Sequence, residues 1–352
     1  MKKILPFILV IAIAVVWGFA KYKAAELQLV QESSHKRTLH LFAMSDYFPA
    51  NVIKEFEFKN NCEVRYDNFS SNEELLAKLQ AGATGYDVIV PSDYMVQALI
   101  ANKLITPLDK KRLPNFHNLG KDFVQVPFDA GSNYSVAYTW GTTGLIFNTK
   151  FVKGDIDSWD VLFKKEYSGH ISLLDDEREV LGAMLQKLGF SVNTINKTEL
   201  LSAQKLLITL KPYVRLFASD PKQHLLSGDV WISQIYSGDA HQVMKTNPEL
   251  HYIVPKEGGV IWIDTLAIPQ HSHNEDLAYA FINTILDPSV AALLTEQLLY
   301  SSPNEAADAL ITDEKLRSSN LRKLSVGHLE FLKDLGVNGE VWDQLWTEAK
   351  SH

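Results

Sequence analysis

Between residues 37 and 101 the sequence alternates three times between a short apolar stretch and a helical pattern. The apolar stretches RTLHLFAM (37–44), CEVRYDNF (62–69) and YDVIVPS (86–92) predict strands, and residues 49–59, 70–82 and 94–101 predict helices. Alternation at this spacing favours a parallel sheet with right-handed crossovers. Ligands bind beyond the carboxyl ends of the strands in such sheets, so we examined the residues that follow each strand.

A second pattern of the same kind runs from about residue 143 to residue 262. It contains GLIFN, HISLLDD, a helix over 179–188, VWISQIY, and HYIVP leading into GGVIWID, and LAIP (266–269) predicts one more strand. Residues 138–144 and 262–269 are expected to cross between the two halves, which makes one half discontinuous and places a cleft at the crossings. The predicted fold is α/β and two-lobed, with mixed, mostly parallel sheets flanked by helices and two crossover hinge segments. Lobe 1 is assigned to residues 38–140 plus 265–310, and lobe 2 to residues 141–264 plus 311–352.

The first twenty residues differ in kind from the rest. Lys2 and Lys3 precede an unbroken apolar run, residues 4–20, which predicts an export signal or an uncleaved membrane anchor, followed by a linker over 21–37. The expected location is therefore periplasmic. Cys62 is the only cysteine, so an exported chain has no internal disulfide and depends on burial for its stability. The net charge of −8 argues against nucleic acid as a partner.

The stretch GGVIWID ends on a tryptophan and a carboxylate that share one face of a strand, because residues two apart on a strand point the same way. Other strand ends and crossings supply further acids and rings, and none of these positions holds lysine or arginine. The set suits an organic cation, because carboxylates accept hydrogen bonds from an ammonium and aromatic rings accommodate both its charge and its methylenes. A linear diamine or triamine fits two acidic clusters separated by rings. The candidate residues are Asp46, Tyr47, Ser92, Tyr94, Asp176, Glu179, Tyr236, Asp239, Trp262 and Asp264.

Each of these residues also has a purely structural interpretation. Asp46 and Asp176 are suited to capping helices, the tyrosines and Trp262 to core positions, and Asp239 to a turn. Asp264 is hardest to explain in this way, because an unpaired acid inside an apolar run is costly to bury.

Other chemistry has weaker support in the sequence. The segment PQHSHNED resembles an exposed turn more than a metal site, and phosphate-loop and G-x-S-x-G motifs are absent. We expect no metal and no cofactor. The acids of LLDDEREV leave a carboxyl-dependent hydrolase open as an alternative.

At these residues the chain resembles the periplasmic spermidine/putrescine-binding proteins of bacterial polyamine ABC transporters. The resemblance runs from about residue 38 to about residue 308, and its most specific stretches are YDVIVPSDY, YTWGTTGLIFN, LLDDEREVLGAMLQKLGF, PKEGGVIWIDTLAIP and YSSPNEAA. It implies two lobes that close on a polyamine without catalysis and then engage an inner-membrane permease. It also implies ligand contacts from Ser45, Asp46, Tyr47, Ser92, Tyr94, Asp176, Glu179, Trp262, Asp264 and Tyr300.

The sequence departs from the family pattern at several of these positions. Met44 replaces the tryptophan before Ser45, and Tyr236 stands where a tryptophan is usual. Asp239 resembles the putrescine-type pattern, whereas the Asp176–Glu179 spacing resembles the spermidine type. Leu332 aligns with the glutamine of the spermidine-type site. The class of ligand is therefore predicted and the individual polyamine is not. A membrane-tethered polyamine sensor remains an alternative to transport.

Overall fold

The computed structural model describes residues 17, 21, 23, 36–45, 47–82, 85–319 and 328–351. Of the predicted leader (1–20) and linker (21–37), all but residues 17, 21, 23, 36 and 37 lie outside this part. Within the described residues, no single helix has the length and apolar composition needed to cross a membrane. In this part of the chain, α10 (Glu275–Ile285) and α11 (Pro288–Leu298) meet those requirements only when taken together, and they are bent by 73° at the break between them.

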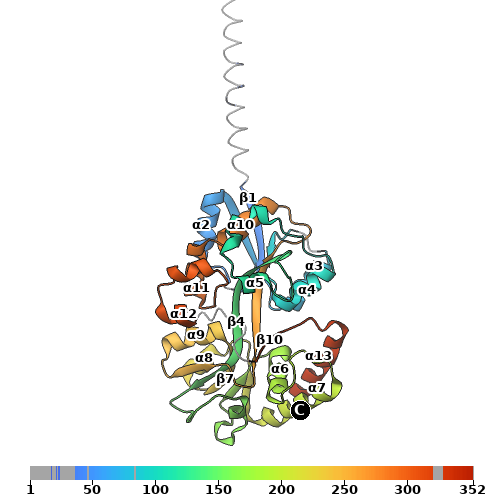
Figure 1. Cartoon of the computed structure of the whole chain (residues 1–352), viewed down its shortest axis with the longest axis vertical. Helices are drawn as coiled ribbons and strands as arrows, with labels where there is room; N and C mark the ends of the chain where they lie inside the picture. The colour runs from blue at the N-terminus through green and yellow to red at the C-terminus, as the bar shows by residue number, and fades with distance from the viewer. Residues whose placement is uncertain are drawn as a thin grey trace, which may run out of the picture.

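Two long antiparallel strands run through both halves of the molecule and join them (Figure 1). They are β4 (Ser135–Asn148) and β9 (Gly259–Ala267), and both are almost entirely buried. The predicted crossings are thus paired strands, in the register Gly141 opposite Trp262 and Thr139 opposite Asp264. A bulge at Tyr138 shifts this register between Ala137 and Thr139. The prediction of a separate strand over 266–269 was wrong, because Leu266 and Ala267 are the last residues of the single strand β9.

The first lobe is a sheet in the order β2-β1-β3-β9, with β1 parallel to both β2 and β3. The predicted strand–helix alternation is confirmed here, although the third strand is reduced to two residues. Ser71 accepts a hydrogen bond from the amide of Glu74 and so fixes the start of α3. The elements are β1 (Arg37–Ala43), α2 (Ala50–Asn60), β2 (Cys62–Asn68), α3 (Asn72–Gln80), β3 (Val88–Ile89), α4 (Asp93–Ala101), the 3-10 turns Lys110–Arg112 and Pro114–Asn118, α5 (Lys121–Val124), α10 and α11.

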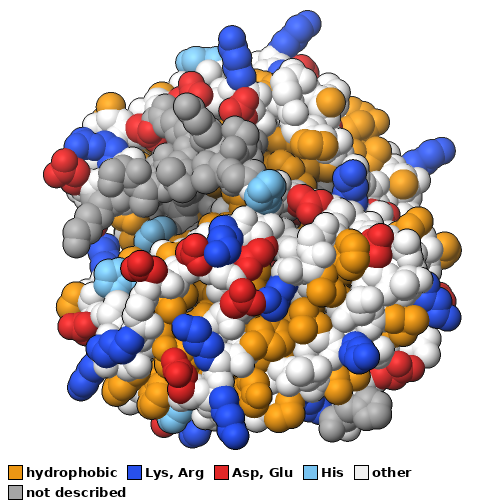
Figure 2. Space-filling view, turned by 60° about the horizontal axis from the view of Figure 1, so that its bottom comes forward, with side chains coloured by type: hydrophobic (Ala, Val, Ile, Leu, Met, Phe, Trp, Pro, Cys, Tyr) orange, Lys and Arg blue, Asp and Glu red, His pale blue; other side chains and the backbone are white. Residues whose placement is uncertain are grey.

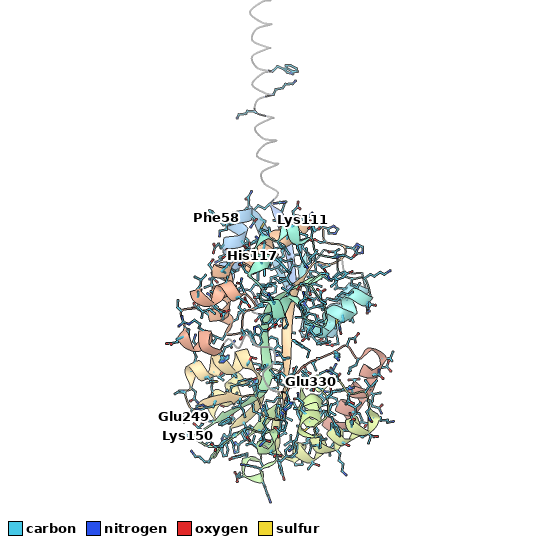
Figure 3. The ribbon with its side chains drawn as sticks, viewed as in Figure 1. Phe58, Lys111, His117, Lys150, Glu249 and Glu330 are labelled. Atoms are coloured by element: carbon cyan, nitrogen blue, oxygen red, sulfur yellow. The ribbon has the colours of Figure 1, made fainter. Side chains whose placement is uncertain are left out.

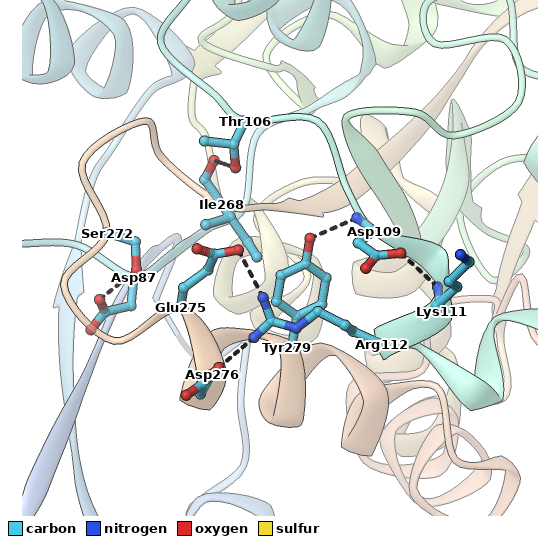
Figure 4. A network of polar contacts seen from close by, with 10 residues as sticks. All are labelled: Asp87, Thr106, Asp109, Lys111, Arg112, Ile268, Ser272, Glu275, Asp276 and Tyr279. Atoms are coloured by element: carbon cyan, nitrogen blue, oxygen red, sulfur yellow. Dashed lines mark hydrogen bonds and ion pairs between the residues drawn. The ribbon is translucent and has the colours of Figure 1, made fainter.

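The returning segment, α10 and α11, is attached to the first lobe by apolar and polar contacts. Phe281 and Ile282 lie in the same buried cluster as Leu39 and Leu41 of β1. Arg112 stacks on Tyr279 and pairs with the two acids that begin α10, Glu275 and Asp276 (Figure 4). Asp87 in turn accepts hydrogen bonds from the hydroxyl of Ser272 and from the amides of His273 and Asn274. The two histidines of PQHSHNED therefore lie in a structural turn.

The second lobe continues the sheet in the order β4-β7-β5-β6, with β8 also paired to β4. Its core contains the fully buried Trp159 and Trp342. The elements are the 3-10 turns Trp159–Phe163 and Lys165–Tyr167, β5 (Ile171–Leu173), α6 (Glu177–Lys187), α7 (Lys197–Leu210), the 3-10 turn Lys211–Tyr213, β6 (Val214–Phe217), α8 (Lys222–Ser227), β7 (Ile232–Tyr236), α9 (Ser237–Thr246) and β8 (Leu250–Ile253).

The C-terminal segment contributes to both lobes. The 3-10 turn Glu305–Leu310 and α12 (Glu314–Ser319) follow α11, and Ala307 and Ile311 lie in a cluster with residues of α11. Further on, β10 (Leu329–Phe331) pairs with β9, a 3-10 turn spans Gly336–Asn338, and α13 (Gly339–Ser351) packs on α6 and α7.

Labelled surface residues mark the two lobes. Phe58, Lys111 and His117 lie at the outer end of the first lobe, whereas Lys150 and Glu249 belong to the second (Figure 3). On the face seen in Figure 2, acidic and basic side chains are interspersed. The net negative charge is therefore not concentrated on that face.

Candidate functional site

The carboxylate of Asp264 is held at the junction of the lobes by two hydroxyl groups. Asp264 lies on β9 with 4% of its surface exposed, and it accepts hydrogen bonds from Ser92 Oγ (2.6 Å) and from the Tyr47 hydroxyl. Asn72 fixes Ser92 by accepting from its amide and donating to its hydroxyl, each at 3.0 Å. Burial raises the pKa of Asp264, and the two hydroxyl donors oppose that rise.

Next to Asp264, aromatic side chains form a wall around Trp262. The Trp262 ring meets Tyr300 at 5.2 Å and Tyr236 at 6.0 Å between centroids, both in edge-to-face geometry. Tyr94 joins the same cluster, and so does Leu332, which comes from the segment after β10. The Trp262 indole Nε1 is buried and has no hydrogen-bond partner among the described residues. We call Trp262, Tyr94, Tyr236, Tyr300 and Leu332 the aromatic wall.

Two glycines leave room for the rings of this wall. A Cβ atom on Gly141 would lie 2.5 Å from Cζ2 of Trp262, and one on Gly238 would lie 2.0 Å from Cε1 of Tyr300. Both distances are below any tolerable contact between carbon atoms. Glycine is therefore required at these positions for space, and at neither position does the backbone adopt a positive φ.

Near Tyr236 of the wall, the start of α6 supplies two acids. Asp176 caps the helix by accepting from the amides of Arg178 (2.9 Å) and Glu179 (3.1 Å). Glu179 is 4% exposed, and its Oε2 atom has no hydrogen-bond partner among the described residues. Burial raises the pKa of both carboxyls, well above the usual range for Glu179. Burial, and then the charges of Asp176 and Glu179, also raise the pKa of Tyr236.

A further acid, Asp93, lies between these groups. It is 1% exposed, its Oδ1 accepts from the amide of Tyr94 (2.7 Å), and its Oδ2 has no partner among the described residues. Burial raises its pKa well above the usual value, and the charge of Asp264 adds to the rise. The adjacent Tyr94 hydroxyl points away and donates to Glu73 at 3.0 Å.

Asp239 differs from the other acids because it has a cationic partner. Lys222 Nζ lies 2.9 Å from Asp239 Oδ1 and 3.0 Å from Gln242 Oε1. Asp239 lies in the first turn of α9 beside Gly238. Burial raises the pKa of Tyr300, and the charge of Asp239 adds to the rise.

Residues 51–320 match the family model described as bacterial extracellular solute-binding protein. The chain belongs to this family. It is 33% identical to the spermidine/putrescine-binding periplasmic protein of Salmonella typhimurium over 95% of this chain and 99% of that protein. It is 35% identical to a putrescine/cadaverine-binding protein of Pseudomonas aeruginosa, over 89% and 93% of the two chains.

A solved relative has the same architecture as this solute-binding protein. The substrate-binding protein of a spermidine/putrescine ABC transporter from Streptococcus pneumoniae superposes with a TM-score of 0.80, at 32% identity over 90% of this chain and 99% of that one. The two-lobed fold and the family resemblance seen in the sequence are confirmed. The predicted periplasmic location is also confirmed by the family and by the relatives' names.

The solute-binding protein gathers most of the predicted site residues in one place. Tyr47, Ser92 and Asp264 are joined by hydrogen bonds, and Tyr94, Tyr236, Trp262 and Tyr300 meet in the wall. The charges of Asp176 and Glu179 raise the pKa of Tyr236, and the charge of Asp239 raises the pKa of Tyr300, so these acids lie near the wall. Their roles toward a ligand stay predictions.

One predicted residue, Ser45, and one substituted position, Met44, lie apart from this group. Ser45 is exposed and accepts a hydrogen bond from Asn68 Nδ2 at 2.9 Å, and Asp46 lies outside the described residues. Met44 packs against the first-lobe core, where its carbonyl accepts from the Tyr66 hydroxyl.

Sequence reasoning missed Asp93, Lys222, Gly141 and Gly238. Asp93 sits between two predicted residues in PSDY and was open to the argument from strand ends. The glycines appear in GTTG and YSGD, but their need for space follows only from which ring each one faces. Lys222 lies 17 positions before Asp239 on another helix, and nothing in the sequence joins the two.

Proposed function

We propose that this protein binds a linear polyamine between its lobes and delivers it to an inner-membrane ABC permease. The observation that carries the proposal is a pair of buried carboxylates, Asp264 and Glu179, that both lie near the aromatic wall. Among the described residues, neither forms an ion pair with lysine or arginine. The names of the relatives, which bind spermidine, putrescine or cadaverine, support the same class of ligand.

The physical argument rests on the cost of burying charge. An isolated buried carboxylate is strongly unfavourable, and here burial raises the pKa of both groups. An alkyl ammonium, with a pKa of about 10.4 by analogy with lysine, brings the missing positive charge at neutral pH. Its methylenes would lie along Trp262 and Tyr300, and cation–π attraction adds about 0.5–2 kcal/mol.

Closure of the lobes is the proposed link between binding and transport. Ligand can bias closure only through contacts that the open form lacks, so both lobes have to touch it. We propose the boundaries 140/141 and 264/265, which place Tyr47 and Ser92 in lobe 1 and Glu179 and Tyr236 in lobe 2. The bulge at Tyr138, where β4 changes register against β9, is the proposed hinge. We also propose that the protein is not an enzyme, which the relatives support because they are binding proteins.

Calorimetry with putrescine, cadaverine, spermidine and spermine tests the proposal. The wild type should bind at least one of them, and Asp264→Asn should weaken that binding at least 100-fold, about 2.7 kcal/mol or more. The loss follows because the ammonium gives up its hydration without gaining a charged partner. Asp157→Asn is the matched control, since Asp157 is an exposed acid paired with Lys256 and should leave affinity unchanged.

Two results would count against the proposal in different ways. If the wild type binds none of the four amines, the ligand class is wrong. If amines bind but Asp264→Asn and Asp157→Asn behave alike, the ligand does not meet Asp264. Release of sugar from candidate oligosaccharides would instead support the hydrolase.

A further inference from the structure

Lys222 places an ammonium group beside the candidate site. Its Nζ atom lies 2.9 Å from Asp239 Oδ1, 3.0 Å from Gln242 Oε1 and 3.6 Å from Asp220 Oδ2. The lysine side chain is 25% exposed and that of Asp239 only 14%. The ammonium donates hydrogen bonds to Asp239 and Gln242 and forms a longer ion pair with Asp220, so its charge is already compensated by the protein itself.

This ion pair adjoins the aromatic wall. Asp239 follows Gly238, whose Cα is packed against the Tyr300 ring, and Tyr300 contacts Trp262. The charges of Asp239 and Asp264 both act on the Tyr300 hydroxyl. Tyr300 therefore lies near both carboxylates, of which Asp264 is held by hydroxyl groups and Asp239 by Lys222.

We propose that Lys222 is a specificity-determining residue, whose ammonium occupies the carboxylate of Asp239 and withholds it from the ligand. The proposal rests on the proposed function. A lysine ammonium and the terminal ammonium of a polyamine are the same chemical group, so each can satisfy Asp239 in the same way. The lysine is tethered, which gives it a high effective concentration at Asp239. A ligand amine that reached this point would have to displace it and would gain little.

The consequence is a length filter. Because Lys222 already neutralises Asp239, a ligand ammonium can form favourable contacts only with the carboxylates of Asp264 and of the acids of α6. Removing the Lys222 ammonium should open a second anchoring point near Tyr300. The benefit should go to polyamines whose second amine spans from Asp264 to Asp239, and not to the others.

The test is a double-mutant cycle with Lys222→Met and Asp239→Asn, measured by calorimetry with putrescine, cadaverine, spermidine and spermine. Methionine keeps an apolar stem of similar length and removes the charge. We expect Lys222→Met to tighten binding of at least one of the four amines tenfold or more and to change their rank order. In the Asp239→Asn background the same substitution should change every affinity less than threefold.

Lys256→Met is the matched control, because Lys256 pairs with the exposed Asp157 away from the site and should leave every affinity unchanged. Lys222→Gln replaces the methionine variant if the latter does not fold, as judged by its melting temperature. The inference is overturned if the charge-free variant shifts all four affinities equally or not at all, or if its gain persists in the Asp239→Asn background. Absence of any polyamine binding by the wild type would instead overturn the proposed function.

Discussion

At the residue scale, the site depends on what each carboxylate has for a partner. Asp264 has two hydroxyl donors, Asp239 has a lysine, and Glu179 keeps one oxygen without a partner among the described residues. An acid with only neutral donors is the one that most needs an incoming cation, because hydroxyls satisfy its hydrogen bonds and leave its charge uncompensated. This ranks Asp264 and Glu179 above Asp239 as ligand contacts.

At the residue scale, the sequence predicts some features of the site and not others. Trp262 and Asp264 could be placed together because the period of a strand fixes their common face. The partners of the acids could not be predicted, because they come from α4, α8 and the loop after β1, and only the folded chain brings these elements together. Local patterns therefore identify side chains with a role, and tertiary contacts decide which role each one has.

Gly238 offers a direct test of the wall. Gly238→Ala would place its Cβ in the Tyr300 ring, so we expect about 1–3 kcal/mol of destabilisation from overpacking and at least tenfold weaker polyamine binding. The measurements are urea denaturation and calorimetry. Gly182→Ala is the control, since Gly182 is also helical and its Cβ would lie 3.5 Å from Val192, an ordinary contact. It should be neutral or stabilising by up to about 1 kcal/mol. Equal behaviour of the two variants would contradict the assigned role of Gly238.

At the element scale, β4 and β9 show what pattern reading recovers and what it loses. Residues 138–144 and 262–269 were predicted to cross between the lobes, and they lie in these two paired strands and the residues just after β9. Composition did not show that both crossings are parts of long buried strands, because a fully buried strand lacks the polar alternation that marks a strand in sequence. The same limit explains why residues 266–269 were read as a separate strand.

At the start of α6, the surroundings of Glu177 disfavour its charged form. Burial raises the pKa of Glu177 to about 7, and the charges of Asp343 and Asp176 add to the rise, against Arg178. When folding raises the pKa of an acid, the folded state is favoured most at low pH, where the group is protonated in both states. For Glu177 the free energy of unfolding falls as the pH rises from the unfolded pKa of about 4.5 through the folded pKa of about 7. Glu177→Gln should therefore raise the melting temperature more at pH 8 than at pH 4.5.

The measurement is the melting temperature of the wild type, of Glu177→Gln and of a comparison variant across this pH range. Asp122→Asn provides the comparison, because Asp122 is an exposed acid in the first turn of α5. Its effect should not grow with pH. If Glu177→Gln raises the melting temperature equally at pH 4.5 and pH 8, the acids around α6 do not disfavour the charge of Glu177.

At the scale of the whole molecule, two-lobed organisation was predictable because strand–helix alternation recurs on both sides of the crossings. The path of the C-terminal segment was not predictable in the same way. Its Leu332 enters the aromatic wall while Trp342 and Trp346 complete the second-lobe core, and an amphipathic pattern alone does not say which surface it will cover. The contribution of Leu332 to the wall is thus a property of the complete fold.

Binding should depend on pH through the acids that both lobes direct at the ligand. The pKa values of Asp264, Asp176 and Glu179 are raised by burial, so part of each carboxyl is protonated at a pH where an exposed acid is fully charged. An entering ammonium favours the charged forms and expels those protons. We therefore expect putrescine affinity to fall at least tenfold between pH 8 and pH 5. The tyrosines of the wall, whose pKa values are raised above 10, stay neutral throughout.

Calorimetry in two buffers of different ionisation enthalpy measures the protons directly. At pH 5.5 the apparent binding enthalpy should depend on the buffer and correspond to net proton release, and the release should be smaller at pH 8. Asp264→Asn should reduce the release without abolishing it, because Glu179 and Asp176 still titrate. The unliganded melting temperature at each pH separates this effect from acid unfolding. A flat affinity from pH 8 to pH 5, with enthalpies independent of buffer, would mean that the ligand's charge is not neutralised by these carboxylates.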